Sequence, residues 1–341
     1  MKELAQGSNI PILDSLRAFA ALSVCLFHFV CTTTGYITTE WVLAVFSVGK
    51  YGVQLFFVIS GFVIPWAMFN AGFTFPYFFK FLLKRLARLE PPYVFSIVIA
   101  LTILFLREKL LGSHNDHLEV SFKQVILHFG YLIPFFEGYK WLNQVYWTLA
   151  IEFQYYFFIA LLFIPLIRAR MLYRIIIYIT IIALSFIGSD KFLPYWLPIF
   201  LLGVILFLYK SKLIINKEFY TVTAFVLIFC IYKYSVTSVL YTMIPIVSVL
   251  FFSDLKIKGL NFFGKMSYSI YLIHPLIGAS FINILSHSVN SFIGKIFVIF
   301  SGIVITLISS YIMYLIVEKP SKKNTFVLWN SKEQVVIRYQ G

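Results

Sequence analysis

The segment at residues 12–29, "ILDSLRAFAALSVCLFHF", is apolar enough to form a membrane-spanning helix, yet it contains Asp14, Arg17 and His28. An ionisable side chain at the centre of a spanning helix costs from about 2.5 kcal/mol upward, so such residues are rare in lipid and usually functional. Whether this segment lies in a membrane, and what its ionisable residues contact there, has to follow from the rest of the chain.

The composition of the whole chain is typical of a protein surrounded by lipid. Of its 341 residues, 60% are hydrophobic and 20% aromatic, and 12% are charged, which is about half the charged share of soluble domains. Apolar runs long enough to span a bilayer predict an all-α polytopic membrane protein. The ten predicted segments are 13–33, 51–69, 91–106, 146–167, 172–188, 192–209, 218–234, 238–253, 263–285 and 292–317.

The basic residues are distributed unequally between the two sides of the predicted membrane. Twenty of the 28 Lys and Arg residues fall on one side and 8 on the other. Because basic residues accumulate in cytoplasmic loops, we expect both termini in the cytoplasm. This topology explains the net charge of +14, so the lipid bilayer is the expected partner and no nucleic acid is needed. We expect one integral membrane domain over 1–320 and a short cytoplasmic tail over 321–341.

The ionisable residues of the first segment follow helical spacing. Arg17 and His28 are eleven residues apart, which places both on one face of a helix and about 16 Å apart along its axis. With Arg17 at the cytoplasmic edge of a core about 30 Å thick, His28 is expected near mid-membrane. Asp14 lies one turn before Arg17 and is expected to pair with it. The alternative is a salt bridge at the helix mouth plus a hydrogen-bonded packing histidine.

Two other ionisable residues are expected at a similar depth. The stretch "VYWTLAIEFQYY" places Trp147 in the interfacial aromatic belt and Glu152 about 7.5 Å deeper. A carboxylate there needs a water-filled cavity or a partner, such as His28 or a hydroxyl; a protonated structural glutamate is the alternative. His274 precedes Pro275, which breaks a helical hydrogen bond, so His274 is expected to cap the helix locally or to orient a substrate.

A third cluster lies in the stretch "KRLARLEPP". Arg85 and Arg88 are one turn apart with Lys84 adjacent, and arginine pairs bind phosphates through bidentate hydrogen bonds. Ordinary positive-inside anchoring explains the same residues, and the spacing alone does not decide between the two. Glu318 is a candidate counter-ion for this cluster.

These positions together suggest a chemistry. A near-neutral base inside the membrane suits proton removal from a hydroxyl, and a cytoplasmic arginine pair suits a phosphorylated donor. Acyl transfer from coenzyme A to a sugar hydroxyl needs both, but proton-coupled transport is also compatible. No P-loop, Gly-x-Ser-x-Gly elbow or His-Glu-x-x-His zinc motif is present, and no metal site is expected from the spacing of Cys and His.

Five stretches of the chain resemble, in order and spacing, signature blocks of the membrane-bound acyltransferase 3 family. They are "LDSLRAFAALSVCLFHF", "GVQLFFVISGFVI", "FFKFLLKRLARLEPPY", "WTLAIEFQYYF" and "MSYSIYLIHPL". The resemblance implies ten spanning helices and transfer of an acyl group, usually acetyl, from cytoplasmic acyl-CoA to sugars of surface glycans. Its Arg-x10-His motif matches Arg17 and His28, its Arg-x-x-Arg motif matches Arg85 and Arg88, and its Trp-(Ser/Thr)-Leu-x-x-Glu block ends at Glu152.

The resulting prediction is a membrane O-acyltransferase, specifically an O-acetyltransferase, of a bacterial inner membrane. Acetyl-CoA would be a co-substrate rather than a permanently bound cofactor, and the acceptor a lipid-linked sugar or a glycan such as O-antigen, capsule or exopolysaccharide. His28, Glu152 and Arg17 are the expected catalytic residues. His28 is expected to act as general base, with a transient acyl carrier as the alternative, and Glu152 to hold His28 in the useful tautomer or to shuttle its proton. Alternatives are a proton-coupled glycan or lipid transporter, or acylation of an amino sugar or small molecule. The acceptor, the acyl chain and the oligomeric state cannot be predicted, and specificity is expected in the outer loop 107–145.

Overall fold

The computed structural model describes residues 10–33, 35–111 and 120–327, and every regular element in these ranges is a helix. This confirms the predicted all-α class. The α-helices are α1 (Ile12–Phe27), α2 (Glu40–Ser47), α3 (Gly52–Asn70), α4 (Phe78–Leu111), α5 (Phe122–Phe129), α6 (Tyr146–Arg168), α7 (Met171–Leu184), α8 (Leu193–Lys210), α9 (Asn216–Lys233), α10 (Val236–Phe251), α11 (Lys258–Lys265), α12 (Ser267–Ile273), α13 (Ser280–Ser286), α14 (Phe292–Met313) and α15 (Lys319–Val327).

Short 3₁₀ and π elements connect or extend these helices. They are η1 (His28–Thr32), η2 (Val48–Tyr51), η3 (Phe75–Tyr77), η4 (Ile133–Phe135), η5 (His274–Ala279) and η6 (Tyr314–Glu318), of which η1, η5 and η6 are π-helical. Single turns of π-helix often occur at functional sites. The first residue of η1 is His28, the first of η5 is His274 and the last of η6 is Glu318, so each includes a residue that the sequence had singled out.

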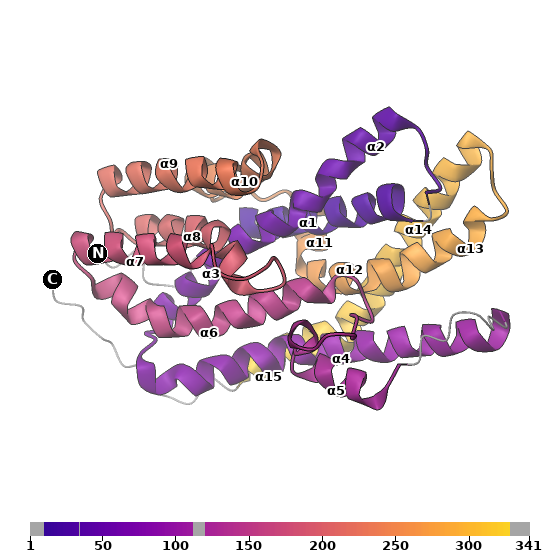
Figure 1. Ribbon diagram of the computed structural model, residues 1–341, viewed down its shortest axis with the longest axis horizontal. Helices are drawn as coiled ribbons and strands as arrows, with labels where there is room; N and C mark the ends of the chain where they lie inside the picture. The colour runs from indigo at the N-terminus through magenta and orange to yellow at the C-terminus, as the bar shows by residue number, and fades with distance from the viewer. Residues whose placement is uncertain (1–9, 34, 112–119, 328–341) are drawn as a thin grey trace.

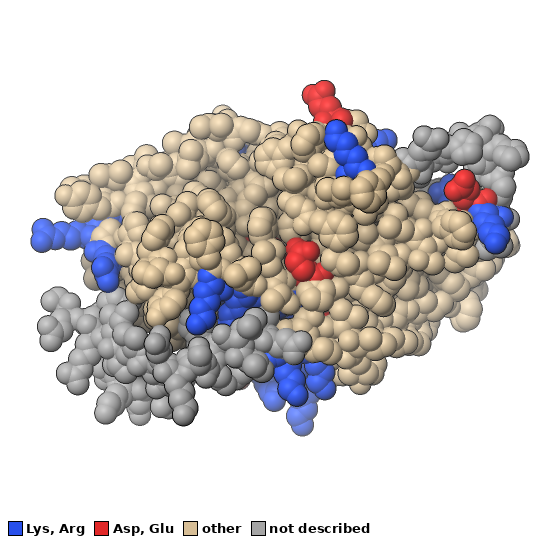
Figure 2. All heavy atoms as spheres, turned by 90° about the horizontal axis from the view of Figure 1, so that it is seen from below, with Lys and Arg blue, Asp and Glu red and all other residues tan. Residues whose placement is uncertain are grey.

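The polytopic prediction is also confirmed. Seven helical stretches of the described chain are long and apolar enough to cross a membrane, and α7 and α10 are shorter apolar helices. Each of the ten predicted segments overlaps a helix. Nine of them correspond to the seven long stretches and to α7 and α10, and the tenth corresponds to α9, which carries charged residues near both ends. The long helices lie side by side along the longest axis of the molecule (Figure 1). Figure 2 shows a largely uncharged surface with Lys, Arg, Asp and Glu in small separate groups, as expected for a face in contact with lipid.

The helix α4 differs from its prediction. From its apolar runs the sequence predicted a span over 91–106, and from its basic and aromatic residues a cytoplasmic segment over 70–90 between two spans. Instead α4 runs without a break from Phe78 to Leu111 and includes both Pro91 and Pro92. The two prolines lack N–H groups and therefore remove two backbone hydrogen bonds, but packing against neighbouring helices keeps the axis continuous. As a result, the basic cluster lies on the first turns of a spanning helix.

The described part of the outer loop contains a short amphipathic helix. In α5 the side chains of Phe122 and Ile126 are 80% and 50% exposed, whereas Leu127 and His128 are buried. His128 Nδ1 donates to the Gln124 carbonyl (2.7 Å), and His128 Nε2 accepts from the Leu142 backbone N–H (3.0 Å). At eight residues, α5 is too short to span a bilayer. Residues 112–119 of the loop and 328–341 of the predicted tail lie outside the described residues.

Candidate active site

A cavity of about 540 Å³ lies inside the bundle between α1, α3, α4, α6 and α12. Its lining follows α3 from Val53, near the start of the helix, to Ala71, just after its end. At 1.5 Å per residue this corresponds to about 27 Å along the helix axis. The volume is typical of a small-molecule site, and the length suits an extended ligand.

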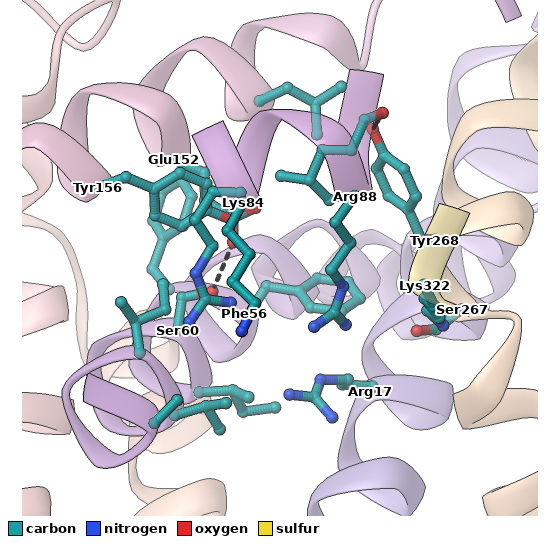
Figure 3. A pocket seen from close by; sticks show the side chains of 18 of the residues that line it. Arg17, Phe56, Ser60, Lys84, Arg88, Glu152, Tyr156, Ser267, Tyr268 and Lys322 are labelled. Carbon is teal, nitrogen blue, oxygen red and sulfur yellow. Dashed lines mark hydrogen bonds between the residues drawn. The ribbon is translucent and has the colours of Figure 1, made fainter. Parts of the chain in front are cut away.

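The cavity carries an excess of positive charge. Three acidic side chains line it, Asp14, Glu152 and Glu318, against six basic ones, Arg17, Lys84, Arg85, Arg88, Lys265 and Lys322. The basic residues come from α1, α4, α11 and α15. In Figure 3, Arg17, Lys84 and Arg88 extend into the same space from different sides. Such a field favours a ligand with several negative charges.

The predicted pair at the start of α1 is present. Arg17 Nη1 lies 3.1 Å from Asp14 Oδ1, one helical turn away. The backbone of α11 approaches α1 closely here, because a Cβ atom on Gly264 would lie 2.0 Å from the Asp14 carbonyl oxygen. A hydrogen bond from Ser15 to Asn261 joins the same two helices. These contacts hold Arg17 at the wall of the cavity.

The partners of Glu152 are hydroxyl groups. Its Oε1 accepts a hydrogen bond of 2.6 Å from Tyr156 and one of 3.1 Å from Ser60, the latter drawn in Figure 3. The guanidinium of Arg85 lies over the rings of Phe81 and Tyr156, 5.3 and 5.7 Å from their centroids, at a distance typical of cation–π contacts. Of the two partners proposed for Glu152, the structure therefore supports a hydroxyl rather than a histidine.

His28 is partnered by His274. Its Nδ1 lies 2.9 Å from Nε2 of His274, and the side-chain nitrogen of Gln144 is 3.4 Å from the same Nδ1. Nδ1 of His274 lies 3.0 Å from the Ile270 carbonyl oxygen, so the predicted local cap is also present. Neither histidine lines the cavity.

The histidine pair and the cavity are separated by one layer of side chains. Tyr271 lines the cavity, and its ring centroid lies 5.9 Å from that of His274. The Tyr271 hydroxyl is hydrogen-bonded to Thr148 (2.9 Å), and the ring of Phe56 meets that of Tyr271 edge-on at 5.7 Å. A ligand that fills the cavity would therefore contact Tyr271, and His274 packs on the other side of this ring.

Glu318 has a different partner from the one expected, and Trp147 lies outside the cavity. Glu318 lines the cavity, but its ion pair is with Lys322 at 2.6 Å, and it accepts a hydrogen bond of 2.5 Å from Ser269, so it is not a direct counter-ion of the arginine pair. Trp147 packs against Trp196 with centroids 5.6 Å apart and does not line the cavity.

Sequence reasoning missed several residues of the site. Tyr156 lies four residues after Glu152 on α6, a spacing at which helical side chains meet, so this partner was accessible from the sequence. Lys322 has the same spacing from Glu318. Ser60 and Lys265 come from other helices, and no local pattern connects them to the rest of the site.

The fold and the site together define a polytopic membrane protein with a strongly basic internal cavity beside a pair of histidines, of which His274 is buried. The chain belongs to the acyltransferase 3 family: residues 10–315 match the family model, which describes an acyltransferase domain. The resemblance seen in the five sequence blocks is thereby confirmed.

Two curated relatives are the proteins named O-acetyltransferase OatA in Staphylococcus aureus strains COL and MRSA252. Each is 26% identical to this chain over 379 residues, which cover 96% of this chain and 59% of the relative. The chain thus spans less than two thirds of the length of these relatives. No solved structure matches it.

Proposed function

We propose that this protein is a membrane O-acyltransferase that moves an acyl group, specifically acetyl, from cytoplasmic acyl-CoA to a sugar hydroxyl. The observation that carries the proposal is a cavity with six basic side chains lying one layer away from two hydrogen-bonded imidazoles. Membership of the acyltransferase 3 family and the activity named for the relatives support the same reaction class.

The basic cavity suits the nucleotide part of coenzyme A. Coenzyme A carries a diphosphate and a further phosphate on its ribose, and arginine forks bind such groups through charge-assisted hydrogen bonds. Arg85, Arg88 and Lys84 on α4 are the proposed phosphate-binding residues. The pantetheine arm then follows the cavity towards Phe56 and Tyr271. The cavity extends about 27 Å along α3, so one molecule bound in this way would bring its thioester to Tyr271, whose ring packs against His274.

His28 is the proposed general base. It takes the proton of the sugar hydroxyl as the hydroxyl oxygen bonds to the acyl carbon, and the carbon–sulfur bond of the thioester breaks. The proton passes from His28 to the departing thiolate, so the products are the acyl ester and free coenzyme A. Arg17 would stabilise the thiolate charge or position the donor. Glu152 would act indirectly, by fixing Tyr156 and through it Arg85.

The acceptor is proposed to be a surface glycan or lipid-linked sugar presented on the outer side of a bacterial inner membrane. O-antigen, capsule and exopolysaccharide contain the required hydroxyl groups. With donor and acceptor on opposite sides, the acyl group would cross the bilayer within the protein. The basic residues of the cavity lie on the side that the positive-inside rule assigns to the cytoplasm, which is where acyl-CoA is found.

The proposal is tested with radiolabelled acetyl-CoA in membranes from producing cells, which supply the native acceptor. His28→Ala should lower transfer at least about 100-fold, as expected for loss of a general base, without changing the KM for acetyl-CoA. The exposed His287 provides the matched control, and His287→Ala should keep transfer at the wild-type level. Equal transfer in His28→Ala and wild type would refute the assigned role.

The same experiment separates the proposal from the alternatives. A proton-coupled transporter would neither consume acetyl-CoA nor release free coenzyme A. Acylation of an amino sugar or of a small molecule would consume acetyl-CoA, but the labelled product would resist mild alkali if it were an amide, or would not stay with the glycan fraction. Alkali-labile label in the glycan fraction supports O-acylation.

A further inference from the structure

The strongest unassigned feature is the contact between the two histidines, which two π-helical segments bring together. His28 is the first residue of η1 and His274 the first residue of η5, 246 residues later. The ring centroids are 5.0 Å apart, whereas the facing nitrogens are 2.9 Å apart, so the rings meet at their edges. The His274 side chain is fully buried and that of His28 is partly exposed.

Close packing holds this contact in place. A Cβ atom on Gly278 of η5 would lie 2.2 Å from the ring of Phe29 in η1 and 2.1 Å from the Thr306 hydroxyl of α14. The absence of a side chain at Gly278 therefore lets η5 approach η1. The ring of Phe29 also packs against His274, with centroids 6.3 Å apart.

The hydrogen-bond partners determine which nitrogen carries each proton. The Ile270 carbonyl can only accept, so Nδ1 of His274 must be the donor of their 3.0 Å bond. No acidic side chain bonds to His274 in the described part of the chain, and a buried unpaired charge is costly, so His274 is neutral. A neutral imidazole with its proton on Nδ1 has a lone pair on Nε2. Nε2 of His274 therefore accepts from Nδ1 of His28.

The same reasoning fixes the state of His28. With its proton on Nδ1, its lone pair lies on Nε2, and within the described residues both polar contacts of the ring are at Nδ1. Nε2 of His28 is thus left for a substrate. The Gln144 amide nitrogen lies 3.4 Å from Nδ1, but it can only donate and so forms no hydrogen bond with a protonated Nδ1; the shorter 2.9 Å contact with His274 therefore decides the tautomer.

We propose that His274 is a positioning residue for acyl transfer: it fixes the tautomer and orientation of His28, and its Nε2 accepts a hydrogen bond from Nδ1–H of His28, which stabilises the imidazolium formed during the reaction. In hydrolase triads a carboxylate accepts a hydrogen bond from Nδ1–H of the catalytic histidine and holds its tautomer and orientation. Here the neutral imidazole of His274 takes the place of that carboxylate. The inference rests on the proposed function, because it assumes that His28 is the base. His274 itself touches no substrate.

Three substitutions of His274 separate positioning from packing. The amide of Gln ends where Nε2 of the imidazole lies, so His274→Gln keeps an acceptor for His28. The amide of Asn ends where Nδ1 lies, so His274→Asn keeps the bond to Ile270 and loses the acceptor. His274→Met is close to Gln in size, but its apolar end offers only a weak acceptor.

The measurement is release of free coenzyme A from acetyl-CoA in inverted vesicles from producing cells. We expect His274→Gln to stay within about tenfold of the wild-type kcat, and His274→Asn and His274→Met to fall by about 100-fold or more, all with the wild-type KM for acetyl-CoA. If His274 only fills space, Met should match or exceed Gln, because an apolar side chain is easier to bury. That order would overturn the inference.

The design separates failure of this inference from failure to insert and from failure of the proposed function. If His274→Asn does not insert into the membrane, the comparison of Gln with Met, which are matched in size, still decides the question. If His28→Ala releases coenzyme A as fast as the wild type, the proposed function fails and the pair has no base to position. If His28→Ala is inactive and Gln and Met behave alike, only the role of His274 is refuted.

Discussion

Replacing Arg88 with glutamine tests whether the basic residues of the cavity bind an anionic ligand or only anchor the chain at the cytoplasmic side. Arg88 lines the cavity on α4 and extends into the same space as Arg17 and Lys84 (Figure 3). Arg88→Gln removes the charge and the bidentate fork while keeping a polar side chain. We therefore expect weaker binding of acetyl-CoA with little change in the chemical step.

The expected magnitude follows from the kind of contact that is lost. A hydrogen bond to a charged group contributes about 1.5 to 3 kcal/mol, and each 1.4 kcal/mol corresponds to a factor of ten in affinity. Arg88 is half-buried, so solvent screens it only partly. The other cations of the cavity remain and compensate in part, so the KM for acetyl-CoA should rise about 10- to 100-fold, with kcat within about threefold.

Lys258 provides the matched control. It is exposed at the first position of α11 and does not line the cavity, and Lys258→Gln changes the net charge by the same amount. Initial rates of transfer from radiolabelled acetyl-CoA give KM and kcat for both variants. Higher ionic strength should reduce the difference in KM for acetyl-CoA between Arg88→Gln and the wild type, because salt screens the charge of Arg88. Equal KM values in the two variants, or a loss confined to kcat, would refute phosphate binding by Arg88.

Three further predictions concern the walls of the site and the outer loop. Gly264→Val should lower stability by about 1 to 3 kcal/mol through overpacking, measured as a lower melting temperature in detergent. At Gly259 an added Cβ would meet no atom within 4 Å, so Gly259→Ala should have a melting temperature equal to or above that of the wild type. Tyr156→Phe keeps the ring beneath the guanidinium but loses the 2.6 Å bond to Glu152, so kcat/KM for acetyl-CoA should fall about tenfold; an unchanged value would exclude this indirect role. Burial lowers the pKa of His128 below its ordinary value of about 6.5. As the pH falls through about 6.5, the unfolded chain therefore binds a proton at His128 before the native protein does. The stability that His128 contributes is complete above about pH 6.5 and declines below it. The melting temperature should therefore drop more between pH 7 and 5.5 in the wild type than in His128→Gln, and parallel curves would contradict the assignment.

Part of the site was predictable because it depends on spacing within one helix. The pairing of Asp14 with Arg17 follows from a separation of one turn, and so does the common placement of Arg85 and Arg88 in the cavity wall. The same rule reaches Tyr156, four residues after Glu152, although that residue was not identified beforehand.

Contacts between helices were predicted less well. Either His28 or a hydroxyl was expected to partner Glu152, and its hydrogen bonds are to the Ser60 and Tyr156 hydroxyls, whereas His28 is paired with His274. The sequence predicted a similar membrane depth for His28, Glu152 and His274, so predicted depth alone did not decide which of them are in contact. The rotation of each helix about its own axis selects among them, and that rotation depends on packing along the whole helix.

The sequence by itself determined that this protein is an all-α membrane protein, pointed to the acyltransferase 3 family, and located most of its long apolar helices. These properties follow from composition and from the constant rise and rotation of the helix. Only the tertiary structure decided that basic residues from four elements line one cavity and that His28 meets His274. Those arrangements depend on the register and rotation of helices that are distant in the chain. Close approaches between helices, such as that at Gly278, determine this register and rotation, and no local sequence pattern predicts them.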